Sequence, residues 1–254
     1  MIESIIFLFF IGIIAGILGA LIGIGGGIIT IPALTLLGLP PYVMSSSSLI
    51  GVVATSISST ITYSKKKLID YTTGYKIGII TIPTSILGAF LAREISLIDF
   101  KFYFAIILLT VAIYIVFKDK ILLKNKDNLE NTKDKRRLMI YPIAIIGGLI
   151  SSLFGIGGGI VFVPLLILIL DTKMKIASPT SQFILLFSSV TGLTTHMILG
   201  HPDYIYGIIL AIGSAIGAQF GVRLLTKVKE TTLTLTFAIF LIIIAIKFFL
   251  ETKV

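Results

Sequence analysis

Long uncharged apolar runs alternate with short charged segments along the whole chain. Two of these runs, Ile5 to Leu37 and Leu138 to Leu170, are each 33 residues long. Runs of about 18 or more apolar residues are typical of helices that cross the hydrocarbon core of a bilayer. The alternating pattern of a membrane β-barrel is absent from the sequence. The pattern therefore predicts an all-α integral membrane protein.

Both 33-residue runs contain the same cluster of glycines. Residues 23–32 read GIGGGIITIP and residues 155–164 read GIGGGIVFVP, with seven of ten positions identical. One unbroken helix of this length would measure about 50 Å at 1.5 Å per residue, against a core about 30 Å thick. Glycine lacks a Cβ and proline lacks an N–H, so we expect each run to form a helix, a loop at membrane depth and a shorter helix. Close helix packing alone is the alternative explanation, but packing does not require three adjacent glycines.

The rest of the chain repeats in the same order. The matching features are the Ser-rich segments Tyr42–Tyr63 and Ser178–Leu199, the pairs Ser47-Ser48 and Thr180-Ser181, the predicted helix N-caps Asp70 and Asp203, and the small-residue contacts Gly88-Ala89 and Gly217-Ala218. We predict two transmembrane repeats, residues 1–117 and 138–254. Each has a glycine-broken helical hairpin or re-entrant segment plus three transmembrane helices. In the first repeat these are 42–63, 74–92 and 102–117.

Residues 118–137 are of a different composition, with eight basic and four acidic residues, and are predicted to form an exposed cytoplasmic linker. The loop Lys65–Lys67 is also basic and is placed in the cytoplasm, because basic loops stay on that side. Its counterpart, Gly200–Asp203, has neither Lys nor Arg, whereas the loop after it carries Lys227 and Lys229. The basic residues therefore come one loop later in the second repeat than in the first. This predicts that the two repeats have opposite orientations in the membrane, which is a common plan in transporters.

Composition narrows the class of protein further. The chain is 56% hydrophobic and 13% charged, with a net charge of +9 and no cysteine. The basic loops are expected to contact anionic lipid rather than nucleic acid. The N-terminal apolar segment is expected to remain as a membrane anchor. With two histidines, no cysteine and no hydrolase or cofactor motif, we expect no enzyme activity, no cofactor and no metal site. The few acidic residues are expected in loops, which argues against cation transport.

The helix breaks supply candidate chemistry. Unpaired N–H groups and the positive end of the helix dipole at the start of a helix suit an anion. The predicted substrate-binding residues are Gly25, Gly26, Gly27, Gly157, Gly158 and Gly159, with Ser47, Ser48, Thr180, Ser181 and Gln182 from the following helices. The Ser-rich helices are alternatively explained by close packing alone. His196, near the end of its span, is either a carrier of a coupling proton or a structural hydrogen-bonding group.

The doubled G-x-G-G-G-x-x-x-x-P motif, with a Ser-Ser or Thr-Ser pair in the next helix of each repeat, resembles the TauE/SafE sulfite exporter family. The resemblance covers nearly the whole chain, although Ser47 stands where Thr is common. It implies a multi-pass plasma-membrane protein that moves sulfite, sulfoacetate or a related anion, usually outward. A membrane-embedded binding or structural protein without transport is the alternative, as is a transporter of another small solute. The sequence leaves the oligomeric state open.

Overall fold

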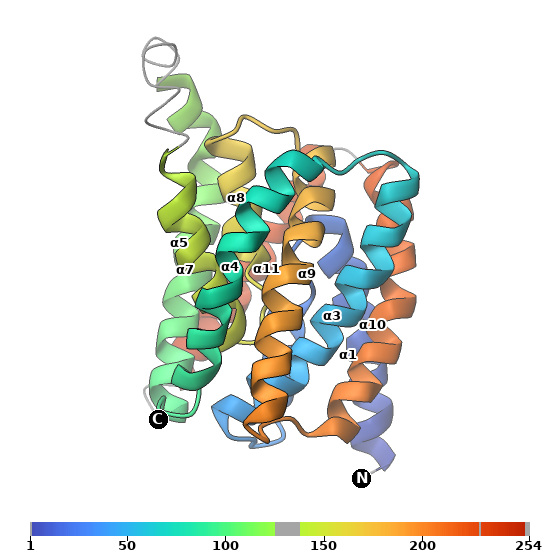
Figure 1. Ribbon diagram of the computed structural model, residues 1–254, viewed down its shortest axis with the longest axis vertical. Helices are drawn as coiled ribbons and strands as arrows, with labels where there is room; N and C mark the ends of the chain where they lie inside the picture. The colour runs from blue at the N-terminus through green and yellow to red at the C-terminus, as the bar shows by residue number, and fades with distance from the viewer. Residues whose placement is uncertain (1, 125–137, 229, 252–254) are drawn as a thin grey trace.

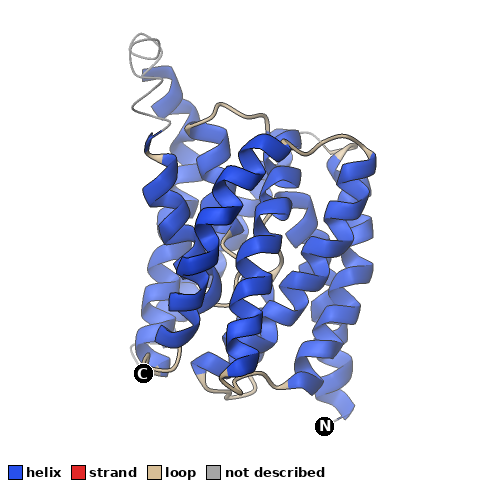
Figure 2. Cartoon of the chain, in the orientation of Figure 1, coloured by secondary structure: helices blue, strands red, loops and turns tan. Residues whose placement is uncertain are grey.

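A computed structural model describes residues 2–124, 138–228 and 230–251, and within these ranges every regular element is a helix (Figure 2). In chain order the helices are α1 (Ile2–Ile22), α2 (Gly27–Thr35), α3 (Pro41–Lys65), α4 (Tyr71–Leu91), α5 (Leu97–Lys124), α7 (Ile140–Leu153), α8 (Gly159–Leu168), α9 (Met174–Ile198), α10 (Tyr204–Leu225) and α11 (Glu230–Glu251). Among the described residues, α1, α3, α4, α9 and α10 are long and apolar enough to cross a membrane. The all-helical prediction is confirmed.

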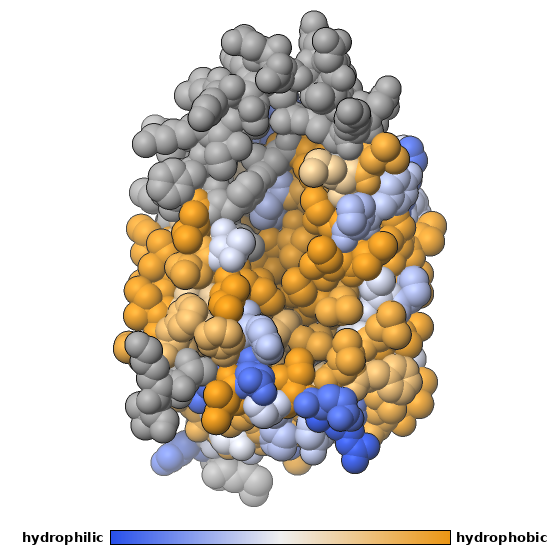
Figure 3. All heavy atoms as spheres, turned by 90° about the vertical axis from the view of Figure 1, so that its left-hand side faces the viewer, coloured by the Kyte–Doolittle hydropathy of each residue, from blue (hydrophilic) through white to orange (hydrophobic). Residues whose placement is uncertain are grey.

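The long helices lie side by side along the long axis of the molecule (Figure 1). Helices α3 and α9 cross at the centre and are the most deeply buried of the spans. Around them, α1 packs on α10, α4 packs on α7, and α5 packs on α11. Figure 3 shows apolar side chains across the middle of one face and strongly hydrophilic ones gathered at its lower edge. This distribution is what a lipid-facing surface requires.

The chain turns back at each glycine cluster, as the sequence predicts. Helix α1 ends at Ile22 and α2 begins at Gly27, while α7 ends at Leu153 and α8 begins at Gly159. Helix α2 has nine residues, about 13 Å, and therefore cannot cross a core about 30 Å thick. In Figure 1 both α1 and α3 begin at the lower end of the molecule, so α1 and α2 form a hairpin that returns to that end.

Some predicted boundaries are wrong. Helix α9 begins at Met174 rather than Ser178, and α5 covers 97–124 rather than 102–117. Asp99, expected in a loop, lies in the first turn of α5, where its N–H donates to Ser96 Oγ at 3.1 Å and its carboxylate accepts from the same hydroxyl at 2.6 Å. This reciprocal cap lets the helix start among charged residues. At its other end α5 extends seven residues into the predicted linker, and residues 125–137 lie outside the described ranges.

Two local predictions are confirmed. Asp70 and Asp203 cap α4 and α10, since their carboxylates accept from the N–H of Thr73 and Tyr206, each at 3.1 Å. The small-residue pairs lie where helices approach closely. A Cβ on Gly88 would meet the carbonyl of Leu149 on α7, and one on Gly217 would meet the carbonyl of Ile13 on α1. Small residues at such contacts let membrane helices associate through their backbones.

The α1–α10 contact predicts a strong effect of side-chain volume at Gly217. The Gly217→Leu variant should lose about 1–3 kcal/mol or more of unfolding free energy, because the obstructing atoms belong to the α1 backbone. Unfolding by sodium dodecyl sulfate in mixed micelles would measure this loss. Ile212→Leu, at a position on α10 that is 52% exposed, is the matched control. Equal unfolding midpoints for the two variants would contradict the close contact.

Candidate functional site

The two glycine loops, loop 1 (residues 23–26) and loop 2 (residues 154–158), meet at the centre of the molecule. A Cβ on Gly27 would overlap Ile156 Cα, and one on Gly159 would overlap Ile24 Cα. The backbones therefore approach more closely than any residue other than glycine permits. The helix N-caps Gly26 and Gly158 have φ of +94° and +81°, a left-handed conformation that glycine adopts without strain.

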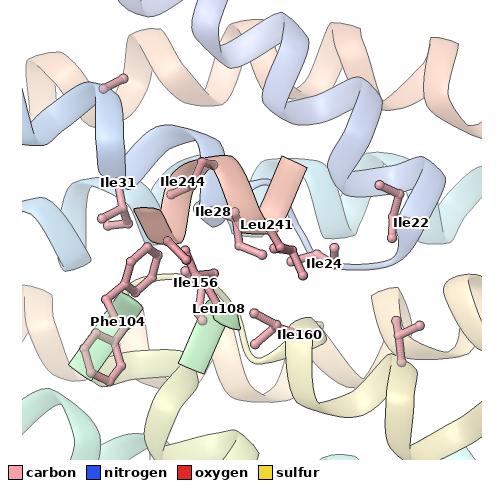
Figure 4. Packing of buried hydrophobic residues seen from close by; sticks show 14 of the residues in the cluster. Ile22, Ile24, Ile28, Ile31, Phe104, Leu108, Ile156, Ile160, Leu241 and Ile244 are labelled. Atoms are coloured by element: carbon pink, nitrogen blue, oxygen red, sulfur yellow. The ribbon is translucent and has the colours of Figure 1, made fainter. Parts of the chain in front are cut away.

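An apolar cluster supports this junction. Figure 4 shows Ile28 and Ile156, from the two halves of the chain, beside Leu108 of α5 and Leu241 of α11. All four side chains are buried. The loops thus rest on a packed base that fixes their position. On another side, Val52 and Leu185 lie against both Gly25 and Gly157.

Serines from each half hold the loop of the other half. Ser48 Oγ on α3 donates to the Gly155 carbonyl at 2.7 Å, and Ser181 Oγ on α9 donates to the Gly23 carbonyl at 2.6 Å. Ser45 Oγ likewise donates to the Leu153 carbonyl at 2.7 Å. Its counterpart Ser178 has its hydroxyl oxygen 3.0 and 3.1 Å from the carbonyl oxygens of Ala20 and Leu21. We call these four residues the crossed serines.

The other predicted polar residues lie elsewhere. Ser47 Oγ accepts from the N–H of Asp203 at 3.0 Å, and Thr180 Oγ1 accepts from the N–H of Asp70 at 3.0 Å. These two hydroxyls therefore join the start of α10 and of α4 to the central helices rather than reaching the loops. Gln182 Nε2 donates to the Gly19 carbonyl at 2.6 Å, near the end of α1.

The short helices begin without side-chain caps. The N–H groups of Ile29 and Thr30 donate to Gly26 O, and those of Val161 and Phe162 donate to Gly158 O. Within the described part of the chain, no partner is found for the N–H groups of Gly27 and Ile28 or their counterparts Gly159 and Ile160. The buried polar side chains of the same part include no Asp, Glu, Lys or Arg. The junction can therefore offer an anion backbone donors and two positive helix ends without a fixed cation.

Five residues at this junction are not among the predicted binding residues: Ser45, Ser178, Ser188, Val52 and Leu185. Val52 and Leu185 carry no signal, because apolar residues are ordinary in a span. Ser188 Oγ donates to the Gly157 carbonyl at 3.0 Å. It follows Ser181 by seven residues, two helical turns on the same face, and this spacing could have identified it.

The predicted proton carrier His196 is buried and has two ring contacts. Its Nε2 lies 3.0 Å from the Ser152 carbonyl oxygen, and its Nδ1 lies 2.8 Å from Nδ1 of His201. His201, in the loop after α9, was not singled out from the sequence. Burial, and secondarily the positive charge of Arg93, lower the pKa of His201 from its ordinary value.

These features define a multi-pass helical protein of the cell membrane whose centre is formed by two broken helices. The family model described as Sulfite exporter TauE/SafE matches residues 8–248, so the chain belongs to this family. The chain is 31% identical to the probable membrane transporter protein YunE of Bacillus subtilis, over 98% of both chains. It is 32% identical to a probable membrane transporter protein of Methanocaldococcus jannaschii, over 87% of this chain and 86% of the relative. No solved structure matches. The protein is a membrane transporter of the TauE/SafE type.

The crossed serines predict a loss of stability in both halves, and Ser48→Ala also removes the buried 2.6 Å hydrogen bond between Ser48 Oγ and Thr30 Oγ1. Ser48→Ala and Ser181→Ala should each cost about 1–3 kcal/mol of unfolding free energy, because each leaves a buried carbonyl without its donor. Thermal unfolding in detergent would compare them with Thr194→Ala. Thr194 is an exposed residue whose hydroxyl bonds only its own helix. If both serine variants unfold at the same temperature as Thr194→Ala, the crossed serines do not hold the loops.

Proposed function

We propose that the protein is a secondary transporter that exports a small anion, such as sulfite or an organosulfonate, bound between the two glycine loops. The observation that carries the proposal is the meeting of two uncapped helix N-termini at one buried junction. The name of the family model supplies the choice of sulfite.

The physical support is the match between donors and charge. A sulfite or sulfonate group has several oxygens that accept hydrogen bonds, and the N–H groups of Gly27 and Gly159 are donors without a partner in the described structure. Two helix dipoles directed at one place add a favourable field. Because no fixed positive side chain is buried there, binding is reversible, as release on the far side of the membrane requires.

The predicted hydroxyl residues take two roles in this proposal. In the present conformation, Ser48 and Ser181 donate to loop carbonyls and so position the N–H donors. Their coordination of substrate oxygens stays a prediction, as it does for Ser47, Thr180 and Gln182, because all five have protein partners here.

We also propose that residues 1–117 and 138–254 are inverted repeats. The directions of the helices in Figure 1 support this, because α1 and α3 rise from the lower end whereas α7 and α9 descend from the upper end. The contacts between the two repeats are symmetric as well. The first helix of each repeat packs on the fourth helix of the other, α1 on α10 and α7 on α4. Such pairs of repeats provide alternating access by moving against each other around a central site.

Substitutions at the junction test the binding site. Gly27→Ala and Gly159→Ala should lower anion flux by about tenfold or more. The added methyl group pushes the opposite loop away from its position, and a cost of ~1.4 kcal/mol in substrate binding corresponds to a factor of ten. In both, the added Cβ meets the backbone of the opposite loop. The measurement is uptake of labelled sulfite or sulfoacetate by proteoliposomes after a pH jump.

Gly51→Ala on α3 is the matched control, because a Cβ there has ordinary contacts of 3.4 Å. If the two junction variants show the same flux as Gly51→Ala, the substrate does not bind at the junction. No anion-dependent flux by the wild-type protein across a broad panel would overturn the transport function itself.

Cysteine labelling tests the inverted arrangement, because the chain has no cysteine of its own. Single cysteines in the Lys66→Cys and Tyr204→Cys variants should react with a membrane-impermeant maleimide from opposite sides. Both positions are exposed, and they lie at the ends of equivalent loops, Lys66 just after α3 and Tyr204 at the start of α10. Labelling of both from the same side would refute the inversion.

A further inference from the structure

The two histidines of the chain form one buried pair near the lower end of α9. His196 has no exposed surface and His201 is 4% exposed. Their Nδ1 atoms are 2.8 Å apart, which is a hydrogen-bond distance. A metal bridging the two nitrogens would need more space, because zinc–nitrogen bonds are about 2.0–2.1 Å long. The contact therefore contains a proton.

The hydrogen bonds fix which atoms carry protons when the pair is neutral. The Ser152 carbonyl only accepts, so His196 Nε2 carries a proton and donates to it. The Nδ1 of neutral His196 then accepts, and His201 Nδ1 must be the donor. This leaves a lone pair on His201 Nε2, a buried atom without a partner in the described structure. A buried polar atom without a partner is costly, and a proton or a water molecule would satisfy it.

The surroundings act on a charged pair in opposite ways. The ring of Tyr42 on α3 lies 4.9 Å from that of His201, close enough for its face to stabilise a cation. His196 also faces the carbonyl end of α7, the negative end of that helix dipole. Arg93, after the end of α4, and burial both disfavour the charge on His201. The carboxylate of Asp203, two residues beyond His201, caps the N–H of Tyr206.

The pair is joined to glycine loop 2 through the end of α7. Ser152 lies two residues before the loop, and the next carbonyl, that of Leu153, is held by Ser45. The hydroxyls of Ser151 and Ser152 are buried and, like His201 Nε2, have no partner among the described residues. The backbone just before loop 2 is therefore hydrogen-bonded to the histidine pair through the Ser152 carbonyl.

The other repeat lacks this arrangement. Tyr63, in the place of His196, donates through its hydroxyl to the Ala20 carbonyl at 2.8 Å, and Leu68 stands in the place of His201. Some contacts do match between the repeats, such as those of Ser48 and Ser181 with the glycine loops, but the histidine pair is present in the second repeat alone.

We propose that His196 and His201 form a single proton-binding site, in which the incoming proton binds Nε2 of His201 and the charge is shared across the Nδ1–H···Nδ1 bond. Its proton is the ion coupled to substrate movement, a step that rests on the anion transport proposed above. The neutral pair holds two ring protons and the charged pair holds three. Loop 2 responds through Ser152.

Nitrogen NMR on the wild-type protein, labelled with histidine carrying ¹⁵N in the imidazole ring only and free of substrate, tests the site. Because the chain has two histidines, only their four ring nitrogens contribute. We expect a nitrogen–nitrogen coupling across the Nδ1–H···Nδ1 bond near neutral pH. On acidification, His201 Nε2 should move from the unprotonated to the protonated range. In His201→Leu, which carries the same residue as the equivalent position Leu68 of the first repeat, the coupling should vanish. Absence of the coupling in the wild type, or independent titration of the two rings, would overturn the site.

Coupling is tested in phosphatidylethanolamine–phosphatidylglycerol vesicles containing a pH-sensitive dye. Sulfite-driven flux by the wild type should move protons, and flux by His201→Leu should move none. Tyr63→Phe, at the equivalent of His196, should leave proton movement intact. Wild-type sulfite flux without proton movement would overturn coupling while leaving anion transport in place. Absence of sulfite flux would instead count against the proposed function, and the NMR result would still decide the proton site.

Discussion

The structure depends on one contact, the backbone-to-backbone approach of two glycine loops at the centre of a membrane-embedded protein. Gly27 against Ile156 and Gly159 against Ile24 leave no space for a side chain. A loop at this depth carries N–H and carbonyl groups that lipid cannot satisfy, so each needs a partner in the protein, in water or in a bound ligand. The carbonyls of Gly23, Gly155 and Gly157 find theirs in the hydroxyls of Ser181, Ser48 and Ser188. The N–H groups at the starts of α2 and α8 are left over, and they are the feature to which a substrate can be assigned.

The small and hydroxyl-bearing residues are best understood as the means by which this contact is reached. Glycines bring α1 against α10 and α4 against α7. That packing confines α3 and α9 to the centre, where their serines meet the loops. Lipid gives helices no hydrophobic reason to associate with one another, so close backbone contact and interhelical hydrogen bonds must supply the attraction. Glycine contacts and serine hydrogen bonds thus act together in holding the helices and loops in place, so the packing explanation considered for the Ser-rich helices applies to these serines.

Sequence reasoning predicted the helices, the glycine breaks and the N-caps Asp70 and Asp203, because each depends on local chemistry. It placed the ends of α5 and α9 wrongly, since apolar content does not mark where a helix stops outside the bilayer. It could not distinguish Ser48, which reaches a loop, from Ser47, which binds the start of α10, because adjacent residues point to different faces of a helix. His201 was missed because its importance comes from a partner five residues away and from burial that a loop position does not suggest. The substrate roles of the predicted residues remain proposals.

The crossed serines have a consequence for how the chain is made. Loop 1 is secured by Ser178 and Ser181, which are synthesised some 150 residues after it, and loop 2 is secured by Ser45 and Ser48, which are already in place. The N–H groups of loop 1 bond Gly19 O within the first half, but the Gly23 carbonyl gains its serine donor only when the second half has been made, whereas the donors for loop 2 precede it in the chain. Completion of the fold is delayed until α9 has been inserted, so a chain truncated before that helix would present quality-control proteases with an opened hairpin at the membrane centre.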